Sequence, residues 1–295
     1  MSGVAVHGFV EDMAPVKRLA AALAAPSALA ALHVFPDGET LPIVPVDGAR
    51  TVIFYRSLHH PNERLISLML AADAYRRAGV PRLVLVAPYL CYLRQDKVFA
   101  PGQPLSRDVI GPMIGDAFDR VLTVQAHLHR TTDLTVALRA PADSLSIAGA
   151  LASLAGGDAR PLVVGPDRES EPWVREAADR LNSEWITFEK QRKGDHDVIL
   201  TLPDAAIVAG RPVLLLDDVC SSGGTLEGAI GQLRQAGAVS IDVAVAHALF
   251  GPEIERRLVA AGARRILSSD SVPHSTNALE LAGVLAAALQ DEMRP

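Results

Sequence analysis

The sequence has few cysteines, few aromatic residues and no excess of positive charge. Its two cysteines, Cys91 and Cys220, lie far apart and form no C-x-x-C pair, which argues against a disulfide framework or a cysteine-built zinc site and fits a reducing, cytoplasmic location. Aromatic residues are 4% of the chain, too few for a platform that stacks single-stranded bases. The formal net charge is −6, so no general surplus of Lys and Arg can coat nucleic acid. Any anionic ligand must therefore be held by a local group of residues.

Long apolar runs and the common nucleotide-binding loops are also missing. No apolar run approaches the length of a membrane span. The stretch 19–32 follows Lys17 and Arg18 and imitates a secretion signal, but it is mostly alanine and contains Pro26, so we expect neither secretion nor membrane binding. The sequence contains neither a Gly-Lys pair of the Walker A kind nor a G-x-G-x-x-G loop. A phosphate site of another kind is therefore needed.

Short β-branched runs alternate with helical patterns along most of the chain, and 49% of the 295 residues are hydrophobic. Near-continuous apolar runs such as 83–87 are typical of strands buried on both faces, and hence of a parallel sheet covered by helices. The predicted strands are 4–9, 51–57, 83–88, 120–125, 161–165, 185–189, 213–219, 241–249 and 264–268. The repetition of strand, helix and strand predicts a doubly wound α/β fold.

The length predicts two modest domains. Apolar residues at helical spacing predict helices around 65–75, 110–114, 174–181 and 226–233. We expect an N-terminal domain of residues 1–143, a C-terminal domain of residues 144–276, and a C-terminal helix, 277–295, that packs back on the first domain. Because ligands of open α/β sheets bind beyond the carboxyl ends of the strands, the residues after each strand are the candidates for chemistry.

The segment 213–225 is the strongest functional signal. A buried strand leads to Asp217 and Asp218, and a run of small residues then opens a helix; the run is Ser221, Ser222, Gly223, Gly224 and Thr225. Exposed backbone N–H groups, hydroxyl donors and the positive end of a helix dipole together form a phosphate cradle. Carboxylates suit sugar hydroxyls and Mg²⁺ better than phosphate. The pattern predicts a site for a phosphorylated sugar, with an ordinary turn capped by Thr225 as the alternative.

This segment resembles the phosphoribosyl-diphosphate motif of the type I phosphoribosyltransferase fold. Five further segments resemble ribose-phosphate pyrophosphokinase, also called phosphoribosyl diphosphate synthetase, in that family's order: F-P-D-G-E at 35–39, Y-L-R-Q-D-K at 92–97, T-V-Q-A-H at 123–127, G-P-D at 165–167 and E-K-Q-R at 189–192. The resemblance covers nearly the whole chain and is to the divergent, archaeal-like class. It implies two doubly wound, mainly parallel-sheet domains of the type I phosphoribosyltransferase kind.

The resemblance implies a ribose-phosphate diphosphokinase, which transfers the β,γ-diphosphoryl group of ATP to the 1-hydroxyl of ribose 5-phosphate and releases AMP. Asp217, Asp218 and the small-residue turn then hold ribose 5-phosphate. The residues implied in ATP binding are Phe35, Asp37, Glu39, Arg94, Gln95 and Asp96. Phe35 is expected to stack on the adenine of a neighbouring subunit, which implies a homo-oligomer of at least two chains with the ATP site at a subunit interface.

The metal and catalytic roles come from the same resemblance. His127 and Asp167 are expected to bind Mg²⁺ at the ATP phosphates, although Gln125 stands where the family usually has an acidic residue. Lys190 and Arg192 are the implied catalytic residues, and positions i and i+2 of an extended segment share a face. Cations there stabilise the charge that grows on the transferred group in the transition state.

Two other functions stay open from the sequence. A phosphoribosyltransferase explains the segment 213–225 but leaves the ATP-like motifs without a role. A catalytically inactive associated or regulatory subunit of the same family explains the departures at Gln125 and Glu169, whereas the presence of Lys190, Arg192 and His127 speaks against it. Turnover of Mg-ATP and ribose 5-phosphate by the pure protein distinguishes these functions.

Overall fold

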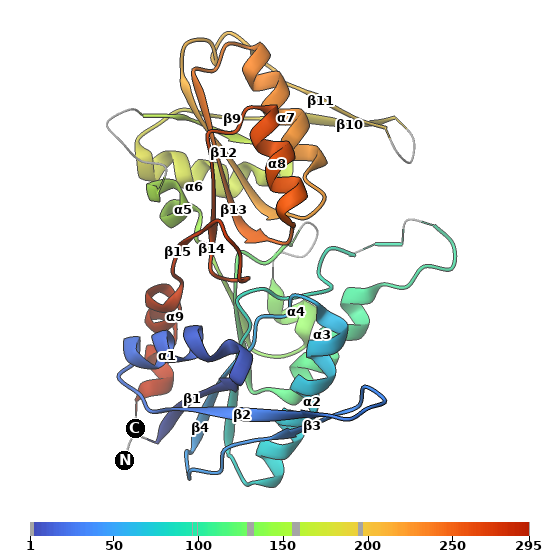
Figure 1. The fold of residues 1–295 in the computed structure, drawn as a ribbon, viewed down its shortest axis with the longest axis vertical. Coiled ribbons are helices and arrows are strands. Elements are labelled where there is room, and N and C mark those ends of the chain that lie inside the picture. Colours follow the sequence, from blue (N-terminus) through green and yellow to red (C-terminus); the bar gives the residue numbers. More distant parts are fainter. Residues whose placement is uncertain are drawn as a thin grey trace. The chain divides into compact units, whose positions relative to one another are not determined.

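The computed structural model describes residues 3–95, 97–98, 100–128, 133–154, 160–193 and 197–294, with the backbone alone at 190–193 and 197–199. The chain divides into two compact α/β units (Figure 1). Unit 1 is Met1–Leu145 with Leu281–Pro295, and unit 2 is Ser146–Glu280. The C-terminal segment therefore belongs to the unit in which the chain begins.

Unit 1 is built on a seven-stranded sheet, in the order β3-β2-β1-β4-β5-β6-β7 among the described residues. Its strands are β1 (Val4–Phe9), β2 (Ser27–Val34), β3 (Thr40–Ile43), β4 (Thr51–Tyr55), β5 (Arg82–Val86), β6 (Arg120–Val124) and β7 (Ala142–Leu145). Neighbouring strands are parallel except β2 and β3, which form an antiparallel hairpin. Its helices are η1 (Val10–Asp12), α1 (Met13–Ala22), α2 (Pro61–Arg77), α3 (Ser106–Ala117), α4 (Leu134–Leu138), α9 (Ala282–Ala288) and η3 (Gln290–Met293).

Unit 2 contains a parallel six-stranded sheet, in the order β15-β14-β13-β12-β8-β9 among the described residues, and a separate antiparallel ribbon. The sheet strands are β8 (Leu162–Gly165), β9 (Trp185–Thr187), β12 (Pro212–Cys220), β13 (Ser240–Ala248), β14 (Arg265–Ser269) and β15 (Asn277–Leu279), and the ribbon is β10 (Glu189–Lys193) with β11 (Asp197–Thr201). The helices are α5 (Ala148–Leu154), η2 (Arg168–Ser170), α6 (Glu171–Leu181), α7 (Gly224–Gln235) and α8 (Pro252–Ala261). None of the helices in the described part of the chain has the length and apolarity of a membrane span.

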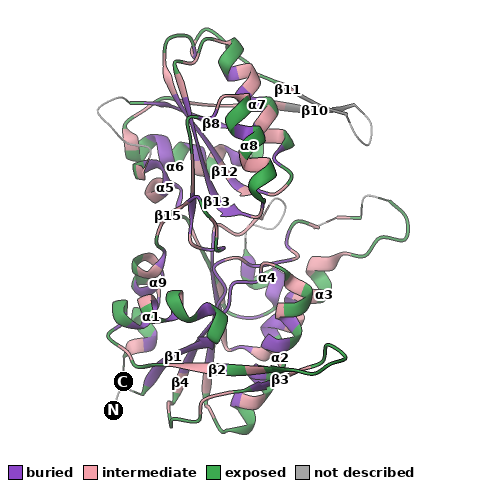
Figure 2. Cartoon of the chain, viewed as in Figure 1, coloured by how far each residue is buried: buried purple, intermediate pink, exposed green. Residues whose placement is uncertain are grey.

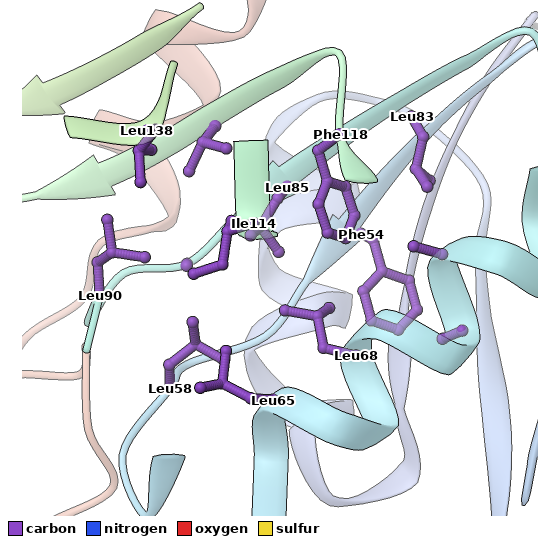
Figure 3. Packing of buried hydrophobic residues seen from close by; sticks show 14 of the residues in the cluster. Phe54, Leu58, Leu65, Leu68, Leu83, Leu85, Leu90, Ile114, Phe118 and Leu138 are labelled. Atoms are coloured by element: carbon purple, nitrogen blue, oxygen red, sulfur yellow. The ribbon is translucent and has the colours of Figure 1, made fainter. Parts of the chain in front are cut away.

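The central strands are buried on both faces, which is why their sequences are almost entirely apolar (Figure 2). In unit 1, Phe54 of β4 and Leu85 of β5 pack with Leu68 of α2 and Ile114 of α3 (Figure 3). Full burial of such a side chain stabilises the fold by about 1.5–3 kcal/mol. The predicted α/β class with mainly parallel sheets is confirmed.

The nine predicted strands are all present, with ends that shift by a few residues. Strands β2, β3, β7, β10, β11 and β15 are not predicted from the sequence. The stretch 19–32 that imitates a secretion signal is split: its first residues end α1, and its second half enters β2, which pairs in parallel with β1 from Val6 opposite Ser27 to Phe9 opposite Ala30. Pairing with a neighbouring strand thus overrides a weak local preference.

Two predicted helix boundaries also differ from the structure. α7 begins at Gly224, two residues earlier than the sequence suggests, because Gly223 has a left-handed φ of +74° and turns the chain into the helix. The C-terminal helix is shorter than 277–295, because Asn277–Leu279 pairs with β14 as strand β15. Thr225 therefore lies inside the first turn of α7.

The C-terminal segment is tied to unit 1 by a buried carboxylate. Glu292 in η3 accepts hydrogen bonds from Arg82 Nε at 2.5 Å, Arg82 Nη2 at 2.8 Å and Arg120 Nη1 at 3.2 Å. These hydrogen bonds lower the pKa of Glu292 below its usual value, and those from Arg82 have the largest effect. Burial acts in the opposite direction and raises the pKa. Because Arg82 and Arg120 begin β5 and β6, the carboxylate joins two strand ends to the last residues of the chain.

We expect Glu292→Gln to lower the free energy of unfolding by about 1.5–3 kcal/mol, the range for hydrogen bonds to charged groups. Urea titration at neutral pH measures the change, and Asp291→Asn is the matched control, since that exposed neighbour pairs with the exposed Arg294. A folded-state pKa below the unfolded value makes this contribution full above the unfolded pKa, and it is lost as pH falls through the folded pKa. If the difference in free energy of unfolding between wild type and E292Q grows as the pH falls, the stabilising role of the ionised Glu292 is contradicted.

Candidate functional site

The two aspartates of the segment 213–225 lie within strand β12, at its carboxyl end. Asp218 is buried and Asp217 is partly buried. Asp217 Oδ1 accepts the N–H of Asp218 at 2.9 Å, and Asp218 Oδ1 accepts the N–H of Val219 at 2.7 Å. These backbone bonds fix both carboxylates at the edge of the sheet where ligands of α/β folds bind.

A third carboxylate lies at the same edge of the sheet. Asp167 follows β8, and β8 pairs with β12 up to Val164 opposite Leu215. Burial first, and then the negative charges of Asp218 and Asp167, raise the pKa of Asp217 above its usual value. Among the described residues, however, no group of three His, Cys, Asp or Glu side chains is placed so that it could hold a metal ion.

The small-residue turn after β12 is shaped by one glycine. Gly223 has a φ of +74°, and a Cβ at this position would lie 2.4 Å from Ile254 Cγ2, so only glycine fits without strain or a shift of the Ile254 side chain. Helix α7 begins at the next residue and has a dozen residues. The first N–H groups of an α-helix have no partner within the helix and bind anions. The predicted phosphate cradle is a strand-to-helix turn in the structure, and its binding of phosphate stays a prediction.

In unit 1, two of the predicted ATP and metal segments follow adjacent strands. Arg94 and Gln95 lie in the loop after β5, where Arg94 is exposed and Gln95 accepts a hydrogen bond from the Ser106 hydroxyl at the start of α3. His127 follows β6 and is partly buried. β5 and β6 are parallel neighbours, so these segments leave the same edge of the sheet. Asp96 lies outside the described residues.

The turn 35–39 joins β2 and β3 at the tip of their hairpin (Figure 1). Glu39 O accepts the N–H of Phe35 at 2.8 Å, and Asp37 Oδ1 accepts the N–H of Glu39 at 3.1 Å. Gly38 has a φ of +90°. Every residue of this turn is exposed, so the side chains of Phe35, Asp37 and Glu39 are open to a ligand or to another chain.

The sheet order separates this turn from the other predicted ATP-binding residues. β2 is three strands away from β5 in the sheet, which is about 14 Å at the usual spacing between strands. The hairpin tip and the loop that carries Arg94 therefore lie at different places along the edge of unit 1. The fold does not bring the turn 35–39 together with Arg94 and His127.

The basic pair at 190 and 192 lies on the ribbon of unit 2. Lys190 is opposite Leu200 and Arg192 is opposite Val198 in the antiparallel pairing of β10 with β11. The sequence predicts one strand over 185–189, whereas the structure ends β9 at Thr187 and begins β10 at Glu189. Positions 190 and 192 are two residues apart along β10, so they share one face of the ribbon, as predicted.

Sequence reasoning missed the residues that support the turn after β12. Ile254 of α8 contacts Gly223, and Leu249 N–H donates to Cys220 O at 2.8 Å. Phe250 is buried beside the ring of His274, at 4.4 Å between ring centroids. The sequence offered no signal for them, since each is an ordinary apolar or histidine residue far along the chain from the turn.

Comparison with known proteins gives a consistent result. Residues 12–117 match the N-terminal domain of ribose phosphate pyrophosphokinase, and residues 141–280 match the phosphoribosyl transferase domain. The chain is 32% identical over 281 residues to the ribose-phosphate pyrophosphokinase of Methanopyrus kandleri, covering 93% of this chain and 94% of the relative. It is 30% identical over 253 residues to that of Pyrococcus abyssi, covering 84% and 85%.

One solved structure has the same fold over almost its whole length. The phosphoribosylpyrophosphate synthetase of Mycobacterium smegmatis superposes with a TM-score of 0.83 at 22% identity and covers 98% of both chains. The predicted two-domain architecture of the type I phosphoribosyltransferase kind is thereby confirmed.

Proposed function

Because this chain belongs to the ribose-phosphate pyrophosphokinase family, we propose that it makes 5-phosphoribosyl 1-diphosphate and AMP from ATP and ribose 5-phosphate. The observation that carries the proposal is the similarity to ribose-phosphate pyrophosphokinase over 93% of the chain. Both domain types are matched in sequence order. A phosphoribosyltransferase is disfavoured, because it leaves residues 12–117 without a counterpart.

Ribose 5-phosphate is assigned to the carboxyl end of β12. The amides and hydroxyls of Ser221, Ser222, Gly223, Gly224 and Thr225 would bind the 5-phosphate. Asp217 and Asp218 would accept hydrogen bonds from the ribose 2- and 3-hydroxyls. The geometry supports this division, because the turn presents N–H donors of α7 while both carboxylates are fixed in the strand.

The transfer is an in-line displacement at phosphorus. The ribose 1-oxygen forms a bond to the β-phosphorus, the bond from that phosphorus to the α,β-bridging oxygen breaks, and AMP leaves with the electron pair. The 1-hydroxyl proton is lost to solvent or a base. Lys190 and Arg192 are assigned to stabilise the charge that develops on the transferred group, and Arg94, Gln95 and Asp96 are assigned to ATP.

A divalent cation is part of the proposal, with Mg²⁺ as the expected metal. His127 in unit 1 and Asp167 in unit 2 are proposed as ligands, each within its own unit. The described residues form no group of three possible metal ligands, so Asp167 would supply a single carboxylate in unit 2, and ATP phosphates and water would supply other ligands, as is usual for Mg²⁺. When bound, Mg²⁺ neutralises phosphate charge and favours attack on the β-phosphorus.

A homo-oligomer is part of the proposal, and the position of the turn 35–39 supports it. Phe35, Asp37 and Glu39 are exposed at a hairpin tip that the sheet order separates from Arg94, so they are proposed to complete the ATP site of a second copy. Sedimentation analysis that finds only monomers under turnover conditions contradicts this part of the proposal. The cytoplasmic location stays a prediction.

The test of the reaction uses the purified chain with Mg-ATP and ribose 5-phosphate. We expect AMP and the diphosphorylated sugar to appear in equal amounts, as chromatography and ³¹P NMR measure them. Release of diphosphate from 5-phosphoribosyl 1-diphosphate with a nucleobase would instead identify a transferase. No turnover with any of Mg²⁺, Mn²⁺ and Co²⁺, together with activity on adding a homologue, would identify an associated subunit.

A further inference from the structure

The turn 221–225 is braced by the neighbouring strand end. β12 and β13 pair up to Cys220 opposite Ala248, and the N–H of Leu249 then donates to Cys220 O at 2.8 Å. Cys220 immediately precedes Ser221. We name residues 249–251 the bracing segment, because it holds the residue from which the turn begins.

The bracing segment is held in turn by His274. His274 Nε2 lies 2.9 Å from Phe250 O, and its ring stacks at a tilt on the Phe250 ring. His274 lies in the loop between β14 and β15, 24 residues along the chain from Phe250. The carbonyl and the ring of Phe250 are therefore fixed by one side chain.

The hydrogen bonds around His274 define which ring nitrogen donates. The N–H of Thr276 donates to His274 Nδ1 at 3.2 Å, so Nδ1 is an acceptor. A neutral imidazole then has its proton on Nε2, and Nε2–H donates to Phe250 O. Thr276 Oγ1 also lies 2.8 Å from Nδ1, which fixes the ring orientation further.

Helix α8 links the bracing segment to the turn by a second route. Ile254 N–H donates to Gly251 O at 3.1 Å at the start of α8. The side chain of the same Ile254 lies against Gly223, at 2.4 Å from where a Cβ would be. A shift of the bracing segment therefore reaches the turn through the backbone at Cys220 and through the side chain at Ile254.

We propose that His274 is a positioning residue for the turn 221–225, acting through Phe250, and that it sets the affinity for the phosphate of ribose 5-phosphate. The inference rests on the proposed assignment of that phosphate to the turn. It adds a residue outside the segment 213–225, in the loop between β14 and β15. The effect is on binding, because His274 acts on the turn and not on the reacting atoms.

The test compares His274→Phe, which keeps a ring beside Phe250 but has no donor, with His274→Gln, whose amide N–H can reach Phe250 O. Calorimetry measures the Kd of ribose 5-phosphate without ATP, and steady-state assays measure kcat and both KM values. For H274F we expect the Kd and KM for ribose 5-phosphate to rise about 5–10-fold, the scale of one lost hydrogen bond. Its kcat and its KM for ATP stay within about two-fold of wild type, which also shows that it folds.

Two further variants separate the inference from the site assignment. H274Q is expected to recover most of the affinity, and Ser275→Ala, which loses the bond from Ser275 to Glu255, is expected to bind as wild type does. Wild-type affinity in H274F, or an equal loss in S275A, overturns the role of His274. Thr225→Ala tests the turn itself. If this variant leaves the Kd of ribose 5-phosphate unchanged, the phosphate assignment is wrong, and the proposed role of His274 is then wrong too. Since the Kd needs no turnover, an inactive wild type refutes the reaction while the role of His274 is still measured.

Discussion

Replacing Lys190 by alanine is expected to lower kcat by about 10²–10⁴-fold, the scale on which removal of one preorganised electrostatic contact slows a reaction. The physical reason is that charge develops on the transferred diphosphoryl group only in the transition state, so a cation placed there accelerates the chemical step. The KM for ribose 5-phosphate is expected to change little, because that substrate is assigned to β12. Rapid-quench measurement of AMP formation in a single turnover isolates the step.

The ribbon supplies a matched control for this variant. Lys193 lies on the same strand β10, opposite Asp197 of β11, and its position is on the other face from Lys190. Lys193→Ala removes the same charge from the same ribbon and is expected to keep kcat within a few-fold of wild type. Equal losses in K190A and K193A would mean that general positive charge on the ribbon is responsible, and an unchanged kcat in K190A would refute the catalytic role.

Asp217→Asn is expected to lower kcat/KM for ribose 5-phosphate by about 10–100-fold and, at the same time, to make the protein more stable. The loss follows from replacing a charged acceptor of sugar hydroxyls, because hydrogen bonds to charged groups contribute about 1.5–3 kcal/mol. The gain follows from removing a partly buried charge that Asp218 and Asp167 repel. We expect the free energy of unfolding at neutral pH to rise by about 0.5–2 kcal/mol, the usual size of a single stabilising substitution.

The pH dependence of this stability difference has a definite sign. The folded-state pKa of Asp217 is raised, so the folded protein holds its proton more tightly than the unfolded chain, and ionisation destabilises the fold. The advantage of D217N is therefore full above the raised pKa and disappears as pH falls below the ordinary carboxyl pKa. Asp179→Asn, at an exposed position of α6, is the control. A D217N variant that is less stable than wild type at neutral pH contradicts the assigned electrostatics.

Much of the fold was predictable because its signals are local. The apolar runs of β1, β4, β5 and β12 are strands in the structure at or near their predicted bounds, since a strand buried on both faces must be apolar along its length. β2 was not predictable, because its alanine-rich sequence becomes a strand only beside β1. The β10–β11 ribbon was missed for a related reason, since β10 (Glu189–Lys193) is charged and has no apolar pattern to mark it, and β11 forms a strand by pairing with it.

Part of the candidate site was likewise predictable from the sequence, and part was not. Asp217, Asp218 and the turn 221–225 lie close together in the sequence. The succession of buried strand, small-residue turn and helix therefore predicted this part of the site by itself. The family resemblance added the residues for ATP, metal and catalysis, whose roles stay predictions. The sequence did not indicate that Asp167 acts on the pKa of Asp217 or that the turn 35–39 lies three strands away from β5. Strand order decides both, and it depends on which strands pair.

The sequence by itself determined that this protein has few aromatics and no surplus of positive charge, so that an anionic substrate must be bound by a local turn. The sequence also indicated which turn this is, because the small residues of 221–225 and the adjacent pair Asp217 and Asp218 form one local pattern. Only the tertiary structure decided what holds the turn and the chain end in place. His274 reaches Phe250 across 24 residues, and Glu292 reaches Arg82 across 210. Such contacts form when distant segments pack on one sheet, and no local pattern in the chain records them.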